Sequence, residues 1–336
     1  MSHVLAVRLD NDGDVLLAGP AIRALANAHD RVTLLCGPRG ANAAALLPGV
    51  DERVVWRAPW IDPEPTPVDR AGTLALADDL AGRGIDGAVI FGSFHQSPLP
   101  TALVLRLAGV PWIAATSVDY PGSLLDVRHR ISDDVHEVER ALDLVASCGA
   151  FLPAGDDGSL RVRRPGRTMI EPPYVVVHPG ASVPARAWSP ERNAELVAAL
   201  AASGRRVAVT GAPGERSLTA GVAGDAGLDL GGVTDLAGLA DVLAGADAVV
   251  VGNTGPAHLA AAVGTPVVSL FAPTVPAVRW RPWGVAHELL LVDVPCAGCR
   301  ARVCPVEGHP CLEDIPTDEV VAAVDRLAPM REAVLA

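Results

Sequence analysis

An apolar run that ends in Asn253-Thr254-Gly255-Pro256 and continues as an alanine-rich segment carrying His258 constrains the fold of this chain more than any other feature. In such a strand-to-helix junction the first amides of the helix have no partners within it and lie at the positive end of its dipole. An anion docked there is hydrogen-bonded and charge-stabilised, so the junction predicts a phosphate site. Thr254 is the expected N-cap, Pro256 suits the first turn, and Gly255 lets a ligand approach the backbone.

Two further junctions of this kind occur elsewhere in the chain. Near the start, an apolar strand over 4–9 runs into an acidic turn at 10–14 and then into a helix. In the second half, a strand ends at 178–180, and a helix begins with Ser189 as its cap and Pro190 at its first position. One such junction is common in α/β proteins, whereas three at separate places favour a ligand-binding protein.

Strands and helices are expected to alternate twice along the chain. The first series has strands at 3–9, 31–36, 53–56 and 86–91 and helices at 15–28, 69–82, 97–108 and 135–148. The second has strands at 174–178, 206–211, 247–252 and 267–271 and helices at 190–203, 214–224, 235–244 and 255–263. A Pro-, Gly- and Arg-rich stretch over 151–173 separates them. We therefore expect α/β class and two doubly wound parallel sheets, with ligands beyond the carboxyl ends of the strands.

The motifs at the three junctions occur in a characteristic order. They are Gly13-Asp14-Val15 with Pro20, then Pro179-Gly180-Ala181-Ser182 with Arg186, Trp188 and Pro190-Glu191, then Asn253-Thr254-Gly255 with His258. Together they resemble glycosyltransferase family 9, the heptosyltransferase family, over nearly the whole chain. The resemblance implies the GT-B architecture, in which two Rossmann-like domains face a central cleft. The acceptor-side domain is then 1–165, and the nucleotide-sugar domain is 166–336, with a Cys-rich tail and a closing helix.

The resemblance implies an inverting, metal-independent glycosyltransferase. Heptose is the leading candidate for the sugar, ADP-heptose for the donor, and a saccharide or lipid-linked saccharide for the acceptor. Inversion needs a base near the acceptor hydroxyl and stabilisation of the departing diphosphate. Asp14 matches the candidate base of the family, although an acidic residue also suits a helix start for structural reasons. Asp10 and Asp12 crowd it, and because like charges raise a carboxyl pKa, any of the three can be poised as the base.

The second domain is expected to bind the donor. Arg186 stands where the family has a lysine that contacts the donor phosphates, and arginine can replace it with a bidentate fork in this lysine-free chain. Ser182 matches a hydroxyl near the phosphates and Glu215 a carboxylate that reads ribose hydroxyls. The other donor-binding positions that the resemblance implies are Val233 and Thr234, whose backbone lies beside the nucleobase, and Asn253, Thr254, Gly255 and His258 at the diphosphate and sugar.

One position departs from the family pattern, because Asn253 stands where the family has Asp. Asparagine keeps the shape and hydrogen bonding but loses the charge, which leaves the identity of the sugar open. It also permits an alternative, a non-catalytic nucleotide-sugar binding protein. A third reading is a haloacid dehalogenase-like phosphatase using Asp10 and Asp12. It is disfavoured because Asp14 follows the glycine and no lysine is present.

Composition limits the partners. The net charge of −12 disfavours nucleic acid, and an anionic acceptor would need a local group of arginines such as Arg128 and Arg130. No uncharged apolar run has membrane-spanning length, and the N-terminus lacks a signal-peptide pattern. We expect a cytoplasmic protein without a transmembrane segment, for which a peripheral membrane contact stays open.

Four of the six cysteines form a cluster near the C-terminus. Cys296, Cys299, Cys304 and Cys311 have a spacing compatible with a structural Zn²⁺ site, although a second pair at zinc-ribbon spacing is missing. Reduced thiols or local disulfides are the alternative. No cofactor is expected for catalysis.

Overall fold

The computed structural model describes residues 2–93 and 95–330. Met1, Phe94 and 331–336 fall within the two expected domains but lie outside the described residues. The chain divides into two compact units, Met1–Arg163 and Arg164–Ala336. No helix in the described parts of the chain is long and apolar enough to cross a membrane.

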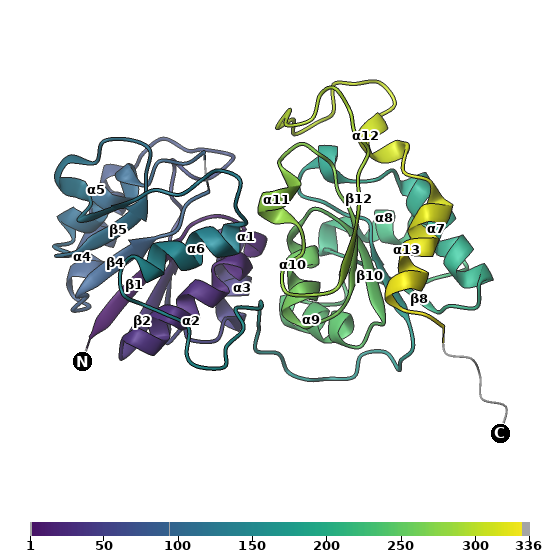
Figure 1. Ribbon diagram of the computed structural model, residues 1–336, viewed down its shortest axis with the longest axis horizontal. Helices are drawn as coiled ribbons and strands as arrows, with labels where there is room; N and C mark the ends of the chain where they lie inside the picture. Colours follow the sequence, from purple (N-terminus) through teal and green to yellow (C-terminus); the bar gives the residue numbers. More distant parts are fainter. Residues whose placement is uncertain (1, 94, 331–336) are drawn as a thin grey trace. The chain divides into compact units, whose positions relative to one another are not determined.

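The first unit is built on a six-stranded parallel sheet of order β3-β2-β1-β4-β5-β6 (Figure 1). The order reverses between β1 and β4, which pair directly, and this reversal defines the switch point of a doubly wound sheet. β1 is buried along its whole length, as its apolar sequence predicts. The strands are β1 (His3–Arg8), β2 (Arg31–Cys36), β3 (Glu52–Val55), β4 (Gly87–Ile90), β5 (Ile113–Thr116) and β6 (Val127–His129).

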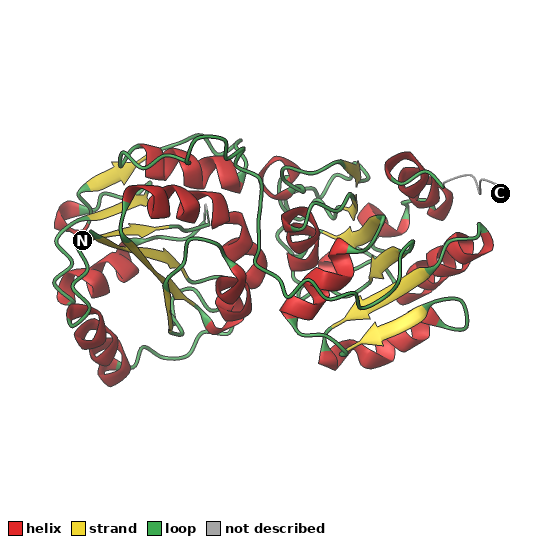
Figure 2. Ribbon diagram, turned by 90° about the horizontal axis from the view of Figure 1, so that it is seen from below, coloured by secondary structure: helices red, strands yellow, loops and turns green. Residues whose placement is uncertain are grey.

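Helices cover both faces of this sheet (Figure 2). Leu5 and Val7 of β1 share a hydrophobic core with Leu80 and Leu105 from two of these helices. The helix expected over 15–28 is two helices, because Pro20 has no amide to donate to the carbonyl of Leu16. The helices are α1 (Asp12–Leu17), α2 (Gly19–Ala28), α3 (Ala41–Leu46), α4 (Arg70–Ala81), α5 (Leu99–Leu107) and α6 (Glu137–Ala146).

The second unit repeats this strand order. Its six-stranded parallel sheet has the order β12-β11-β10-β7-β8-β9, so its first strand, β7, pairs with its fourth, β10, at the switch point. The strands are β7 (Val175–His178), β8 (Val207–Gly211), β9 (Leu228–Gly231), β10 (Ala248–Gly252), β11 (Val267–Leu270) and β12 (His287–Leu290).

Ser189 caps the first helix of the second unit, as expected, by accepting a hydrogen bond from the amide of Arg192 at 3.4 Å. Val177, Leu196 and Val324 belong to one core that joins the sheet to α7 and to the closing helix α13. The helices are α7 (Pro190–Ala202), α8 (Arg216–Ala223), α9 (Leu236–Ala244), α10 (Gly255–Ala262), α11 (Ala277–Trp280), α12 (Pro310–Glu313) and α13 (Thr317–Leu327).

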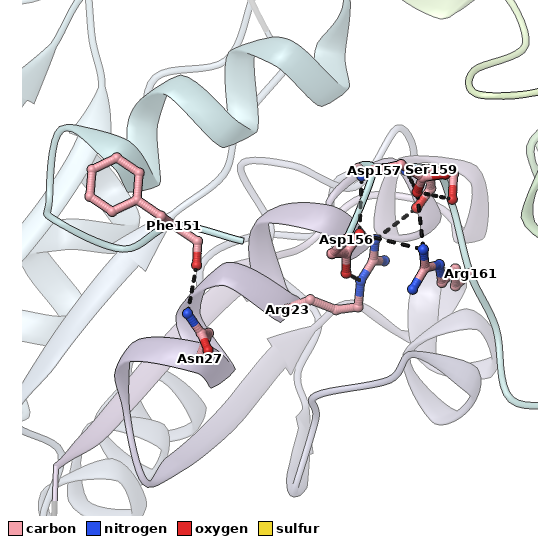
Figure 3. Close-up of polar contacts among 8 residues, drawn as sticks. Arg23, Asn27, Phe151, Asp156, Asp157, Ser159 and Arg161 are labelled. Carbon is pink, nitrogen blue, oxygen red and sulfur yellow. Dashed lines mark hydrogen bonds and ion pairs between the residues drawn. The ribbon is translucent and has the colours of Figure 1, made fainter. Parts of the chain in front are cut away.

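A buried ion pair binds the segment before the second unit to the first unit. Arg23 of α2 donates from Nε and Nη2 to the two carboxylate oxygens of Asp156, at 2.7 and 2.8 Å. Figure 3 shows this pair with Arg161, whose Nη2 lies 3.7 Å from the same carboxylate. The Arg23 hydrogen bonds, outweighing burial, lower the pKa of Asp156 to about 2. Arg163 then donates to the carbonyl of Leu47 at 2.6 Å.

The next residues are fastened to the second unit instead. The carboxylate of Asp241 in α9 accepts from the Arg164 guanidinium at 3.1 Å and from the amides of Gly166 and Arg167, each at 2.9 Å. Burial acts to raise the pKa of Asp241, but these donors lower it overall. The anchoring therefore changes from one unit to the other between Arg163 and Arg164.

Candidate active site

The carboxyl ends of β1 and β4 hold a buried charged cluster around Arg8, the last residue of β1. Its Nη2 donates to Asp14 Oδ1 and to Ser93 Oγ, each at 3.0 Å. Its Nε lies 3.0 Å from Asp10 Oδ2, and its Nη1 lies 4.0 Å from Glu137 Oε2. Three carboxylates thus surround one guanidinium that is 4% exposed.

Asp10 is the acid that faces Arg8 Nε. Its Oδ1 accepts from Gln96 Nε2 at 2.5 Å, but its Oδ2 faces Arg8 in a short contact that is not aligned as a hydrogen bond. Burial raises the pKa of Asp10, Arg8 lowers it, Asp14 raises it again, and the result is about 6. Burial alone would lower the pKa of Arg8, yet the surrounding carboxylates raise it.

The three acids of the turn have separate surroundings. Asp12 Oδ1 accepts from the amide of Ala43 at 2.9 Å and so holds the start of α3, and burial raises its pKa. The side chains of Asp10 and Asp14 are 8% and 20% exposed. Asp14 is therefore the more accessible partner of Arg8, near the start of α1, where a ligand hydroxyl can approach.

A pocket with two arginines borders this cluster at the carboxyl ends of β1, β2 and β3. Asp10, Arg39 and Arg57 contribute to its lining. Arg57 Nη1 lies 2.5 Å from Asp62 and Arg39 Nη2 lies 3.8 Å from Glu64. Both guanidinium groups are partly exposed, so an anionic ligand can compete for them. Of the arginines expected to face an acceptor, Arg128 donates from Nε to the carbonyl of Ser117 at 3.2 Å, whereas Arg130 is exposed.

The switch point of the second unit lies between β7 and β10, and the side chain that ends β7 is neutral. His178, the last residue of β7, is buried with its Nδ1 2.9 Å from Thr210 Oγ1. Burial lowers the pKa of His178 to about 4, so the ring is uncharged at neutral pH. The end of β7 therefore offers a neutral hydrogen-bonding group.

Arg186 lies in the loop after β7, half-buried, and its Nε donates to Thr274 Oγ1 at 3.3 Å. Thr274 follows β11, so this contact joins the carboxyl ends of two strands. A Cβ added to Gly252, at the end of β10, would lie 2.6 Å from the carbonyl oxygen of Arg186. Glycine is therefore needed at this position for the loop to lie against β10.

Glu215 lies close to the same loop. A Cβ added to Gly180 would lie 2.1 Å from Glu215 Oε1, so the carboxylate covers this glycine. Glu215 Oε2 accepts from the amide of Ala212 at 2.7 Å, which leaves Oε1 as the oxygen more available to a ligand. Val233 and Thr234 follow β9, the former exposed and the latter half-buried.

The junction after β10 has the expected form. Thr254 occupies the N-cap position of α10 with extended backbone, Gly255 begins the helix and Pro256 lies in its first turn, although the Thr254 side chain makes no capping bond. His258 is buried one turn into the helix. Asn253 is 5% exposed; its Nδ2 donates to the carbonyl of Ala272 at 3.4 Å, and its Oδ1 is buried without a hydrogen-bond partner.

The expected donor residues thus fall at the carboxyl ends of neighbouring strands of one sheet. Close approaches connect the backbone of Arg186 with Gly252 and the carboxylate of Glu215 with Gly180. Ser182 is exposed in the loop after β7.

The structure does not support the zinc site. Within 2–93 and 95–330, no group of three or more His, Cys, Asp or Glu side chains is placed to hold a metal ion. Cys311 is buried in the core beside α13, Cys299 is exposed, and Cys304 Sγ lies 3.6 Å from the carbonyl of Val306. Burial and the neighbouring thiols of Cys304, Cys296 and Cys299 raise the pKa of Cys311 to about 11, and Cys296 packs partly against the same core.

The sequence did not predict several residues of the two candidate sites, the cluster around Arg8 and the donor site of the second unit. Arg8 carried a usable signal, a charge at the end of an otherwise apolar strand just before an acidic turn. Gln96 and Glu137 are distant in sequence from Asp10, so no local pattern links them. Thr274 could have been noted because it follows a strand that neighbours β10.

The structure thus has two doubly wound sheets, with an accessible acid at one switch point and a helix N-terminus and an arginine at the other. These features suit a two-domain enzyme that binds an anionic ligand. The sequence profile described as glycosyltransferase family 9 (heptosyltransferase) matches residues 96–309. The chain therefore belongs to glycosyltransferase family 9.

Individual relatives agree with this family. Lipopolysaccharide heptosyltransferase 1 of Pseudomonas aeruginosa is 33% identical over 207 residues, which cover 59% of this chain and 57% of that protein. The chain thus matches little more than half the length of this curated relative. The solved structure of E. coli ADP-heptose lps heptosyltransferase II has a TM-score of 0.76 at 20% identity, covering 98% of each chain.

A further structural relative is the E. coli heptosyltransferase WaaC with ADP-2-deoxy-2-fluoro heptose. It has a TM-score of 0.71 at 22% identity and covers 96% of this chain and 99% of that one. These similarities confirm the α/β GT-B fold.

Proposed function

We propose that this protein is an inverting, metal-independent glycosyltransferase that moves a sugar from a nucleotide-diphosphate donor to a saccharide or lipid-linked saccharide. ADP-heptose is the leading donor, because the family and the relatives' names point to it. The observation that carries the proposal is an accessible acid, Asp14, in the first unit together with a helix N-terminus at α10 in the second unit that has no side-chain cap.

In this mechanism Asp14 takes the proton of the acceptor hydroxyl as its oxygen attacks the anomeric carbon. The donor's bond to the diphosphate breaks on the opposite face, which inverts the configuration. Asp14 lies outside the segment 96–309 that matches the family profile, so its role rests on its position beside Arg8 and its exposure.

The second unit stabilises the departing diphosphate. Arg186 supplies positive charge, and the first amides of α10, with Thr254 and Gly255, supply hydrogen-bond donors. Ser182 contacts the phosphates and His258 faces the donor from within α10. Glu215 binds the ribose, and the backbone at Val233 and Thr234 lies along the edge of the nucleobase. The first unit, 1–165 in our assignment, takes the acceptor, and 166–336 takes the donor.

The proposal includes a cytoplasmic location. All six cysteines are free in the structure, which suits a reducing compartment. If the acceptor is lipid-linked, the protein also makes a peripheral contact with a membrane.

A thermal-shift panel of ADP, UDP, GDP, dTDP and their sugars, followed by a transfer assay, tests the proposal. A nucleotide at about 100 times its dissociation constant should stabilise its binding unit by roughly 2.7 kcal/mol. Stabilisation by ADP or ADP-heptose that is lost in Arg186→Ala supports the heptosyl donor. Stabilisation by another nucleotide changes the donor, and no response to any of them contradicts a nucleotide-sugar enzyme.

A second candidate is a non-catalytic nucleotide-sugar binding protein, favoured by the neutral Asn253 in a buried position. Tight donor binding with neither transfer nor slow hydrolysis, and with Asp14→Ala leaving binding unchanged, identifies this alternative.

A further inference from the structure

The buried cluster at the end of β1 contains a second acid, Asp10, that the proposed base does not require. Gln96 holds its Oδ1 at 2.5 Å, and Arg8 Nε faces its Oδ2 at 3.0 Å without an aligned hydrogen bond. A buried carboxylate so weakly compensated costs folding free energy. A purely structural counter-ion for Arg8 would be expected to form the aligned pair.

Arg8 is shared between two carboxylates. It donates from Nη2 to Asp14 at 3.0 Å while its Nε lies 3.0 Å from Asp10. Inside a site of low effective dielectric, a negative charge on one side of the guanidinium weakens its pull on the charge at the other side. The ionisation of Asp10 and the basicity of Asp14 are therefore linked through Arg8.

We propose that Asp10 is a positioning residue for sugar transfer, whose ionised carboxylate competes for Arg8 and so keeps Asp14 basic enough to accept the proton of the acceptor hydroxyl. This inference rests on the proposed function, in which Asp14 is the base. When Asp10 is protonated, Arg8 pairs more fully with Asp14, which becomes a weaker base.

The proton balance of the step is simple. The acceptor oxygen forms its bond to the anomeric carbon, its proton moves to Asp14, and the sugar–diphosphate bond breaks with its electron pair on the diphosphate. Asp10 neither gains nor loses a proton in this step; it acts only through Arg8.

Several groups face Asp10 and contribute to its ionisation. With a pKa of about 6, Asp10 is ionised at neutral pH and is protonated under mildly acidic conditions. The groups that face it or line the adjoining pocket are Arg8 from β1, Asp14 from α1, Gln96 from the segment after β4, Glu137 from α6, and Arg39, Arg57 and Asp62 around the pocket.

The first test is the pH–rate profile of the full-length Asp10→Asn variant. Asparagine keeps the shape and can accept from Gln96, so the fold should be retained. We expect kcat to fall by about three- to tenfold at neutral pH, well below the ~10²–10⁴-fold of a general base itself, with donor KM unchanged. The ionisation near pH 6 should vanish from the profile of kcat/KM.

The matched control is Asp12→Asn, two residues away. Asp12 holds the amide of Ala43, so this variant should lose stability but keep the wild-type profile. An Asp10→Asn enzyme with the wild-type profile would overturn the proposal, because a merely structural Asp10 affects stability alone.

The second test needs no activity. Coupling is reciprocal, so Asp14→Asn, which removes a like charge and frees Arg8, should lower the pKa of Asp10 from its value of about 6. Carboxyl ¹³C NMR titration of Asp10 measures this directly. An unmoved midpoint overturns the coupling whatever the activity. A moved midpoint in a protein that transfers no sugar keeps the coupling but overturns both the transferase proposal and the positioning role of Asp10 in it.

Discussion

The two units have the same strand order but different chemistry at their switch points. In the first, one buried guanidinium is surrounded by three carboxylates. In the second, a neutral histidine and the N-terminus of α10 occupy the corresponding place, with Arg186 half-buried beside them. Topology thus determines where a ligand can bind, and the side chains after each strand determine what is done to it.

The Asp14→Asn variant tests this difference between the units with the largest expected effect. If the first unit handles protons and the second binds the donor, transfer should fall by about 10²–10⁴-fold while donor affinity stays unchanged. Steady-state transfer and calorimetric titration with the donor measure the two effects separately. Lost donor affinity in this variant would mean that the first unit also holds the nucleotide.

A second difference concerns acid stability. His178 has its pKa lowered from 6.5 to about 4, so the unfolded chain takes up its proton first as the pH falls. The neutral, buried ring therefore contributes stability above pH 6.5 that is lost as the pH falls toward about 4, amounting to about 3 kcal/mol. Amide hydrogen exchange of the second unit between pH 7 and 4 measures this loss, and His178→Gln should make it smaller.

The Arg186→Ala variant tests whether the second unit binds the donor. Loss of a charge-assisted contact to phosphate should weaken donor binding by about 1.5–3 kcal/mol, roughly 10- to 100-fold. Titration calorimetry with ADP reads this out. The matched control is Arg167→Ala, since the Arg167 side chain is exposed and only its amide binds Asp241; equal losses in both variants would point to general electrostatics instead of a specific contact.

The smallest expected effect concerns the stability of the first unit at acidic pH. Arg23 holds the pKa of Asp156 at about 2, below its ordinary 3.8, so their pairing contributes stability above pH 4 that is lost as the pH falls through about 2. The contribution is about 2 kcal/mol. Arg23→Ala should lower the stability of the first unit at pH 7 and flatten its response between pH 4 and 2, as followed by hydrogen exchange. A variant that retains the wild-type acid response would exclude this pair as its source.

The central strands could be predicted from sequence because they are buried on both faces. The expected strands over 31–36 and 206–211 agree with β2 and β8 to within one residue. The strands β5, β6, β9 and β12 were missed. β6, β9 and β12 are edge strands, and β9 and β12 have exposed or half-buried residues, so their patterns resemble loops. β5 is internal and buried but has only four residues, two of them alanine, so it carries little strand signal.

The sites were partly predictable for a similar reason. The junction at Thr254 and Gly255 is local, so the helix start could be read directly. The partners of Asp10 come from β1, from the segment after β4 and from α6, and only folding brings them together. The sequence predicted crowding of three acids, whereas the structure turns Asp12 away toward α3.

The change of anchoring at the bond between Arg163 and Arg164 has a consequence for recombination. Arg163 is bound to residues of the first unit and Arg164 to Asp241 of the second, so a crossover at this bond severs none of those hydrogen bonds. If either half is exchanged at this bond for that of a relative, Arg163 stays with the first unit and Arg164 with the second. If the second unit binds the donor as proposed, its donor specificity is exchangeable as one segment without changes to the first unit.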